Sequence, residues 1–207
     1  MAEVTFERII DSLADYGFSG EINPHGYGEP LTDTRLPTFI TTIRRKLPAA
    51  RIVLYTNGDL LTESHFERLM EAGVHRFIVT FHGTDTKLRL TPILTSLGAL
   101  YPHGPTITIQ DFSRTPDQLM NRGGLVSAPA TKATACFYPA NLYFDYLGRS
   151  ILCCNDYRGE VILGDIATQS VRTMLENRRN RRIRSLIFAG LFPFPLCWKC
   201  IGTKPHP

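Results

Sequence analysis

The first 135 residues of this 207-residue chain contain no cysteine, and all five cysteines follow them. This distribution excludes a disulfide framework spanning the chain, because most of the sequence has nothing to cross-link. An odd number of cysteines gathered late in the chain indicates a metal site in its last third instead.

Other absences bear on where the protein works. No apolar run approaches the roughly 20 residues that a membrane-spanning helix requires. The N-terminal segment MAEVTFE has neither the basic nor the apolar region of a secretion signal. We therefore expect no membrane association and a cytoplasmic location. With 43% hydrophobic and 20% charged residues, the composition is that of a globular protein with a substantial core.

Helix and strand signals alternate through the first two thirds of the sequence. The apolar residues Phe6, Ile9, Ile10 and Leu13 follow helical spacing. Further helices are predicted at 36–47, 62–73 (caps included) and 92–100, and short strands at 21–23, 51–55, 76–81 and 106–110. Such alternation is typical of βαβ units that share a parallel sheet.

Three turns follow strands of this predicted sheet. They are Gly28-Glu29-Pro30, Thr56-Asn57-Gly58 and His82-Gly83. Because ligands of parallel α/β folds gather at the carboxyl ends of the strands, we expect a binding site at these turns.

The pattern changes in the last third of the chain. Residues 113–135 are polar and contain glycine and proline, which indicates a boundary. A β-hairpin is predicted next, with strands at 142–145 and 150–153, and a basic helix follows at about 171–188. Cys197 and Cys200 then form a CxxC pair.

The cysteines suit a metal site built from two distant parts of the chain. The CxxC pair supplies two thiolates, Cys136 before the hairpin a third, and Cys153 or Cys154 on its second strand the fourth. Four thiolates satisfy either zinc or a four-iron cluster, so both remain open on spacing alone. A redox CxxC of thioredoxin type is not favoured, because that motif opens a helix after an N-terminal strand.

The spacing of Cys136, Gly148 and Cys153 resembles the C-x(9–15)-G-x(4)-C signature of SPASM and twitch domains. In those domains a later CxxC completes an auxiliary iron–sulfur cluster. The resemblance implies one auxiliary [4Fe–4S] cluster, because the single terminal CxxC matches the shorter twitch version. Its implied ligands are Cys136, Cys153, Cys197 and Cys200. Cys154 is then expected to point to the opposite face of the strand.

The upstream turns resemble the radical S-adenosylmethionine superfamily. Tyr27-Gly28-Glu29-Pro30-Leu31 is similar to its GEP motif, and Thr56-Asn57-Gly58, "LLTE" at 60–63 and "EAGV" at 71–74 follow in the family's order. The resemblance implies that Gly28, Glu29 and Pro30 bind the methionine end of S-adenosylmethionine. The expected contacts to its carboxylate or ribose are Thr56, Asn57 and Thr80.

The same resemblance implies an α/β fold in two domains. Residues 1–112 are expected to form a partial (β/α) barrel of radical S-adenosylmethionine type lacking its first strand. Residues 113–135 form the linker, and residues 136–207 a small α+β SPASM/twitch iron–sulfur domain with a β-hairpin and a helix.

One family feature has no counterpart in this sequence. The C-x(3)-C-x(2)-C motif that holds the catalytic cluster lies, in the family, just before a helix like residues 5–15, and no cysteine precedes Cys136. The chain is then a fragment of a longer enzyme, a subunit whose partner chain supplies the strand and cluster loop, or a degenerate relative. We favour the first, because losing a strand leaves an unpaired sheet edge.

Two functions follow from these features. The first is an enzyme, or its greater part, that acts on a peptide or small metabolite by hydrogen-atom abstraction, with S-adenosylmethionine as cofactor if the missing segment is supplied. The alternative is a non-catalytic iron–sulfur or zinc module that binds a protein or nucleic acid through its arginine-rich helix, with nucleic acid the less favoured partner. The arginines are Arg172, Arg178, Arg179, Arg181, Arg182 and Arg184.

Overall fold

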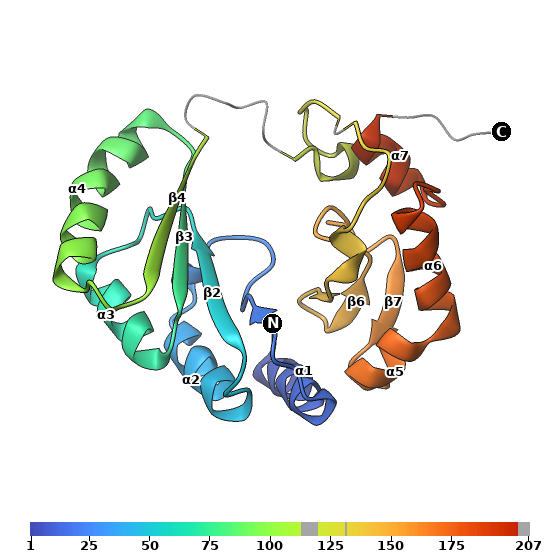
Figure 1. Cartoon of the computed structure of the whole chain (residues 1–207), viewed down its shortest axis with the longest axis horizontal. Coiled ribbons are helices and arrows are strands. Elements are labelled where there is room, and N and C mark those ends of the chain that lie inside the picture. The colour runs from blue at the N-terminus through green and yellow to red at the C-terminus, as the bar shows by residue number, and fades with distance from the viewer. Residues whose placement is uncertain (113–119, 131, 203–207) are drawn as a thin grey trace. The chain divides into compact units, whose positions relative to one another are not determined.

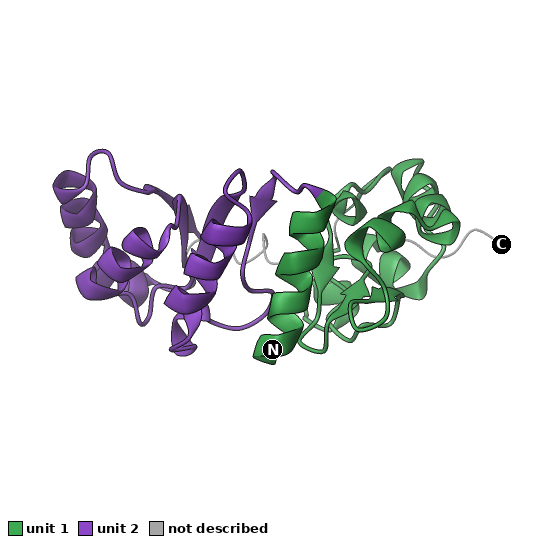
Figure 2. Ribbon diagram, turned by 90° about the horizontal axis from the view of Figure 1, so that it is seen from below, with its two compact units in different colours: residues 1–16, 117–207 green, residues 17–116 purple. Residues whose placement is uncertain are grey.

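The computed structural model describes residues 1–112, 120–130 and 132–202. It divides into two compact units (Figure 2): residues 17–116 form one, and residues 1–16 together with 117–207 form the other. The N-terminal helix thus belongs to the same unit as the last third of the chain. The family-based domains at 1–112 and 136–207 stay a prediction, because they rest on resemblance and not on contacts.

The unit of residues 17–116 is built around a parallel sheet in the order β1-β2-β3-β4. Its strands are β1 (Glu21–Ile22), β2 (Arg51–Thr56), β3 (Arg76–Phe81) and β4 (Thr106–Asp111). Its helices α2 (Leu36–Lys46), α3 (Glu63–Ala72) and α4 (Thr84–Leu100) connect successive strands and gather on one face of the sheet (Figure 1). The predicted βαβ arrangement is confirmed.

Apolar packing between α3 and the sheet forms part of this core. Phe66 of α3 stacks on Phe77 of β3 with ring centroids 4.7 Å apart, and both side chains are fully buried. The predicted caps of α3 are present, since Thr62 accepts a hydrogen bond from the His65 amide and Gly73 ends the helix at φ 117°. Sequence periodicity and capping chemistry therefore suffice to place this helix.

Helix α4 is longer than predicted. The sequence places this helix at roughly 92–100, but α4 begins at Thr84 and holds Pro92 in its interior. Leu90, Leu94 and Leu97 are buried at helical spacing on both sides of the proline. The proline leaves the carbonyl of residue 88 without an intrahelical donor, and Leu88 is 69% exposed, so water can satisfy it.

The other unit contains helix α1 (Glu3–Tyr16) and a three-stranded antiparallel sheet in the order β5-β6-β7. Its strands are β5 (Tyr143–Phe144), β6 (Arg149–Ile151) and β7 (Ile162–Asp165). The predicted hairpin is β5 and β6, while β7 was not predicted as a strand. Helix α1 packs on α5 (Val171–Glu176), and Ser12 Oγ accepts a hydrogen bond from the Val171 amide at 2.8 Å.

The predicted basic helix is two helices. Helix α5 ends at Glu176 and α6 (Arg178–Phe188) begins two residues later. Asn177 separates them with a non-helical ψ of 125°, and its side chain accepts a hydrogen bond from the Asn180 amide. An asparagine that caps the following helix explains the break, because this side chain competes for backbone donors.

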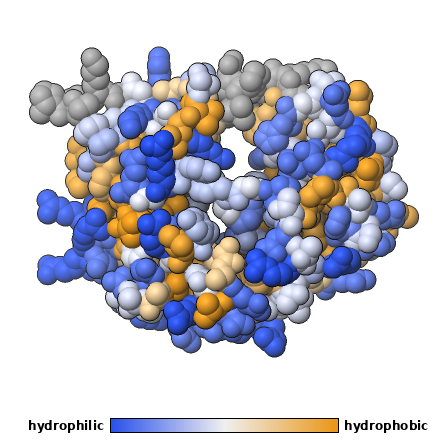
Figure 3. Space-filling view, turned by 180° about the vertical axis from the view of Figure 1, so that it is seen from behind, coloured by the Kyte–Doolittle hydropathy of each residue, from blue (hydrophilic) through white to orange (hydrophobic). Residues whose placement is uncertain are grey.

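The terminal CxxC lies on a further short helix, α7 (Pro195–Ile201). No helix in the described part of the chain is long and apolar enough to cross a membrane. On the face drawn in Figure 3, hydrophilic side chains predominate, with hydrophobic patches between them.

Candidate functional site

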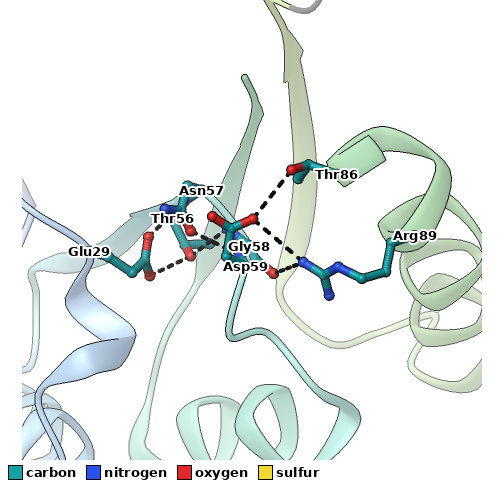
Figure 4. Close-up of polar contacts among 7 residues, drawn as sticks. All are labelled: Glu29, Thr56, Asn57, Gly58, Asp59, Thr86 and Arg89. Carbon is teal, nitrogen blue, oxygen red and sulfur yellow. Dashed lines mark hydrogen bonds and ion pairs between the residues drawn. The ribbon is translucent and has the colours of Figure 1, made fainter. Parts of the chain in front are cut away.

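A carboxylate joins the ends of β1 and β2 (Figure 4). Glu29, which precedes the 3-10 helix Pro30–Thr32, accepts a hydrogen bond from the Thr56 hydroxyl at 2.6 Å through Oε1. Its Oε2 accepts from the Asn57 amide at 2.8 Å, and Oε1 also accepts from the Leu31 amide at 3.1 Å. Three predicted site residues, Glu29, Thr56 and Asn57, are therefore brought together.

Helix α4 holds the same turn from its other side. Arg89 donates a hydrogen bond to the Gly58 carbonyl at 2.9 Å and lies 3.7 Å from the Asp59 carboxylate (Figure 4). Thr86 donates to the same carboxylate at 3.3 Å. These contacts with Asp59 and Arg89 were not predicted, because no sequence signal links residues 30 positions apart. Fixed from both sides, the turn is held in one conformation and would not need to reorganise when a ligand binds beside it.

The remaining predicted cofactor residues are less connected. Gly28 has φ +89°, a left-handed conformation that favours glycine, and Pro30 is buried at the start of its 3-10 helix. Thr80 donates to Gln110 at 3.4 Å. Within the described residues, no hydrogen bond links Thr80 to Glu29, Thr56 or Asn57, so its assignment stays a prediction.

The cysteines lie in the unit that contains β5–β7. Cys153 belongs to a buried apolar core, and Cys136 and Cys197 pack against that core. Cys153 and Cys154 follow β6 in a turn, where the Asp156 amide donates to the Cys153 carbonyl, so the prediction that both lie on the strand is wrong. Cys197 and Cys200 are three residues apart on α7 and so share one face of the helix.

Burial controls the chemistry of these thiols. It raises the pKa of Cys153 to about 12 and that of Cys197 to about 12, and neighbouring cysteines add to both shifts. Burial likewise raises the pKa of Cys200. Thiolates in such a core need a positive group among them, and a metal centre supplies it. The donor set therefore fits a thiolate-bound metal centre.

Zinc and a four-iron cluster are held by thiolates in different ways. Among the described residues, no three His, Cys, Asp or Glu side chains are grouped so that they could hold a metal ion. Zinc draws all its thiolates to about 2.3 Å from one ion, whereas a four-iron cluster is a larger body whose thiolates bind different irons.

A loop far upstream holds the CxxC helix. Asn121 is 5% exposed, and its side chain donates to the Lys199 and Cys200 carbonyls at 3.1 and 3.2 Å. Gly123 has φ +65°, and a Cβ there would lie 2.2 Å from a methyl carbon of Leu196 on α7. The sequence places residues 121–124 in a linker at the domain junction, as a flexible connector or a substrate contact, and the structure shows that they anchor the cysteine helix.

Hydrogen bonds also reach the sulfur atoms. Asn155 is 3% exposed and donates from its side-chain amide to Cys200 Sγ at 3.1 Å. Cys154 is hydrogen-bonded to the Tyr143 hydroxyl, which sets it apart from Cys153 in the core. This difference supports Cys153 as the ligand, an assignment that stays a prediction.

Comparisons with known proteins agree with this geometry. Residues 136–201 match the SPASM family, an iron–sulfur cluster-binding domain. The S-adenosyl-L-methionine-dependent 2-deoxy-scyllo-inosamine dehydrogenase of Niallia circulans is 30% identical over 194 residues, which cover 92% of this chain and 76% of that protein. The chain therefore belongs to the radical S-adenosylmethionine proteins with a C-terminal SPASM domain.

Solved structures extend the comparison to the fold. BtrN in complex with AdoMet and 2-DOIA superposes with a TM-score of 0.80 at 30% identity, over 92% of this chain and 75% of that one. The anSMEcpe protein with bound AdoMet has a TM-score of 0.59 at 14% identity, over 91% of this chain and 72% of that one, which shows a shared fold alone. The predicted radical S-adenosylmethionine fold, with a separate small sheet, is confirmed for this SPASM protein.

We expect Gly123→Ala to destabilise the unit formed by residues 1–16 and 117–207, called the SPASM unit below. The added methyl group meets Leu196 and strains a left-handed backbone, which should lower the free energy of unfolding by roughly 2–4 kcal/mol. Chemical denaturation measures the change. Gly26→Ala is the control, since no heavy atom lies within 4 Å of its Cβ position; equal losses in both variants would contradict the anchoring role of the loop.

Proposed function

We propose that this chain is the greater part of a radical S-adenosylmethionine dehydrogenase that oxidises a small polar molecule and carries one auxiliary [4Fe–4S] cluster. The observation that carries the proposal is the 30% identity, over 92% of the chain, to a dehydrogenase that depends on S-adenosyl-L-methionine. The name of that relative indicates a small substrate, so a small molecule is favoured over a peptide. We further propose that the substrate is an alcohol of cyclitol type.

The auxiliary cluster is assigned to Cys136, Cys153, Cys197 and Cys200. The packing of Cys136 and Cys197 against the core that holds Cys153 supports this set, as does the SPASM match. When bound, the cluster supplies a one-electron acceptor, and S-adenosylmethionine supplies the radical that removes a hydrogen atom. The core shields Cys153 from water and holds Cys136 and Cys197 beside it.

The methionine end of S-adenosylmethionine is assigned to the turns at 28–30 and 56–58. A carboxylate offers about four acceptor positions, and hydrogen bonds from Thr56, Asn57 and Leu31 already occupy three on Glu29. Glu29 therefore acts mainly by fixing both turns, so that their backbone groups are oriented toward the ligand. One acceptor position remains for the ammonium group of the ligand.

The complete reaction also needs a catalytic cluster. The C-x(3)-C-x(2)-C motif that holds this cluster in the family is not among residues 1–207. A further segment of the polypeptide or a partner chain would supply these cysteines.

Metal analysis tests the proposal most directly. After anaerobic reconstitution, we expect about four irons and four sulfides per chain, retained in Cys154→Ala and lost in Cys153→Ala. Iron, zinc and labile sulfide are assayed together with the visible spectrum. About one zinc without sulfide would refute the cluster and favour the non-catalytic zinc module.

Substitution of Glu29 tests the cofactor site. Glu29→Gln replaces one acceptor oxygen by a donor facing Thr56 or Asn57, which should weaken S-adenosylmethionine binding by about tenfold, the effect of losing one hydrogen bond to a charged group. Calorimetry with cluster-loaded protein measures the dissociation constant. Glu63→Gln removes the same charge at an exposed site, the first residue of α3, and should bind as the unaltered protein does. No detectable binding to the unaltered protein would count against the enzyme.

Substitution of Asn155 tests whether the protein tunes the cluster. The amide that donates to Cys200 Sγ stabilises electron-rich sulfur, so Asn155→Leu should lower the reduction potential. One net hydrogen bond of about 1 kcal/mol corresponds to roughly 40 mV for a one-electron couple. Potentiometric titration followed by EPR measures the shift, at iron and sulfide contents equal to those of the unaltered protein. An unchanged potential would show that the amide only packs.

A further inference from the structure

Helix α6 presents positive charge that the protein does not neutralise. It carries five arginines and no acidic residue, and in the part of the chain that the structure describes none of them pairs with a carboxylate. Arg179 and Arg184 donate to backbone carbonyls, while Arg178, Arg181 and Arg182 are exposed. Like charges four residues apart, such as Arg178 and Arg182, destabilise a helix. An anionic partner would offset this cost.

A groove runs beside these arginines. It has a volume of about 730 Å³ and lies between α6 and the segment that precedes α7. Its lining residues are Arg178, Arg179, Arg182, Ile183, Leu186, Pro193 and Phe194. The groove therefore combines guanidinium groups with an apolar floor. Protein–protein interfaces likewise have an apolar centre surrounded by a polar rim.

The floor of the groove is also the wall of the cysteine core. Ile183 belongs to the buried core that contains Cys153, and Phe194 packs against that core together with Cys197. The Cys197 amide donates to the Phe194 carbonyl at 3.0 Å. A partner in the groove would thus contact residues of the same core that holds Cys153 and packs against Cys197.

We propose that this groove docks a small acidic one-electron carrier protein that receives the electron from the auxiliary cluster. The inference rests on the proposed function for the identity of the centre. In the transfer the cluster is oxidised by one electron and the carrier is reduced by one, and no atom moves. Weak redox encounters use interfaces smaller than those of stable complexes, which agrees with a single groove of about 730 Å³.

The apolar floor favours a protein over a nucleic acid. Binding to a phosphate backbone draws on positive charge, with little contribution from apolar contacts at a floor such as Leu186. A protein partner uses both, so loss of charge and loss of apolar surface should each weaken it.

The probe is a plant-type [2Fe–2S] ferredoxin, a small acidic carrier, and calorimetry at low salt measures its binding to the full chain. We expect the double variant Arg178→Gln/Arg182→Gln to bind at least tenfold more weakly and Leu186→Ala several-fold more weakly. Arg181→Gln is the matched control, because it removes one charge from the same helix outside the groove, and it should change affinity less than threefold. Raised salt should weaken binding of the unaltered protein by at least tenfold.

Electron exchange gives a second readout. The rate between ferredoxin and the loaded cluster, followed by stopped-flow absorbance after either partner is reduced, should fall in parallel with affinity in the double variant. Absence of binding, or equal losses in Arg181→Gln and in Arg182→Gln alone, would overturn the docking site. So would tighter binding of a DNA duplex that Leu186→Ala leaves unchanged. Binding is read whether or not iron loads, so failure to form a cluster overturns the proposed function alone.

Discussion

Desolvation of sulfur is the constraint on which the SPASM unit depends. Its core buries Cys153 and packs Cys136 and Cys197 beside it, and burial raises the pKa of Cys153 and of Cys197. Only a positive centre shared among them reverses that shift. The anchoring loop at 121–124, the turn after β6 and the amide of Asn155 all serve to hold sulfur atoms in place for such a centre.

In the unit of residues 17–116, a few polar side chains fix the turns at the ends of the strands. A single carboxylate, that of Glu29, holds the turn after β1 against the end of β2, and Arg89 holds the same end from α4. Both sets of contacts lie at the carboxyl ends of parallel strands, where the ligands of such folds bind. The rigidity of these turns therefore comes from side chains.

Much of this could be read from the sequence, and the limits are physical. The parallel sheet, the caps Thr62 and Gly73 and the grouping of Glu29 with Thr56 and Asn57 follow local patterns that packing did not override. Two features were missed. Pro92 lies inside α4 because the helix tolerates one backbone carbonyl without an intrahelical donor, and the basic helix breaks at Asn177 because this side chain caps α6. The hydrogen bonds from Asn121 to α7 join residues nearly 80 positions apart. A single sequence contains no pattern that predicts such a long-range contact.

The division of the cysteines between two parts of the chain also sets an order of events during synthesis. Cys136 and Cys153 leave the ribosome well before Cys197 and Cys200; at roughly 5–20 residues per second, several seconds separate the two pairs. During that interval the nascent chain carries only the first of these pairs. A centre that uses both pairs can therefore be completed only after α7 has been made.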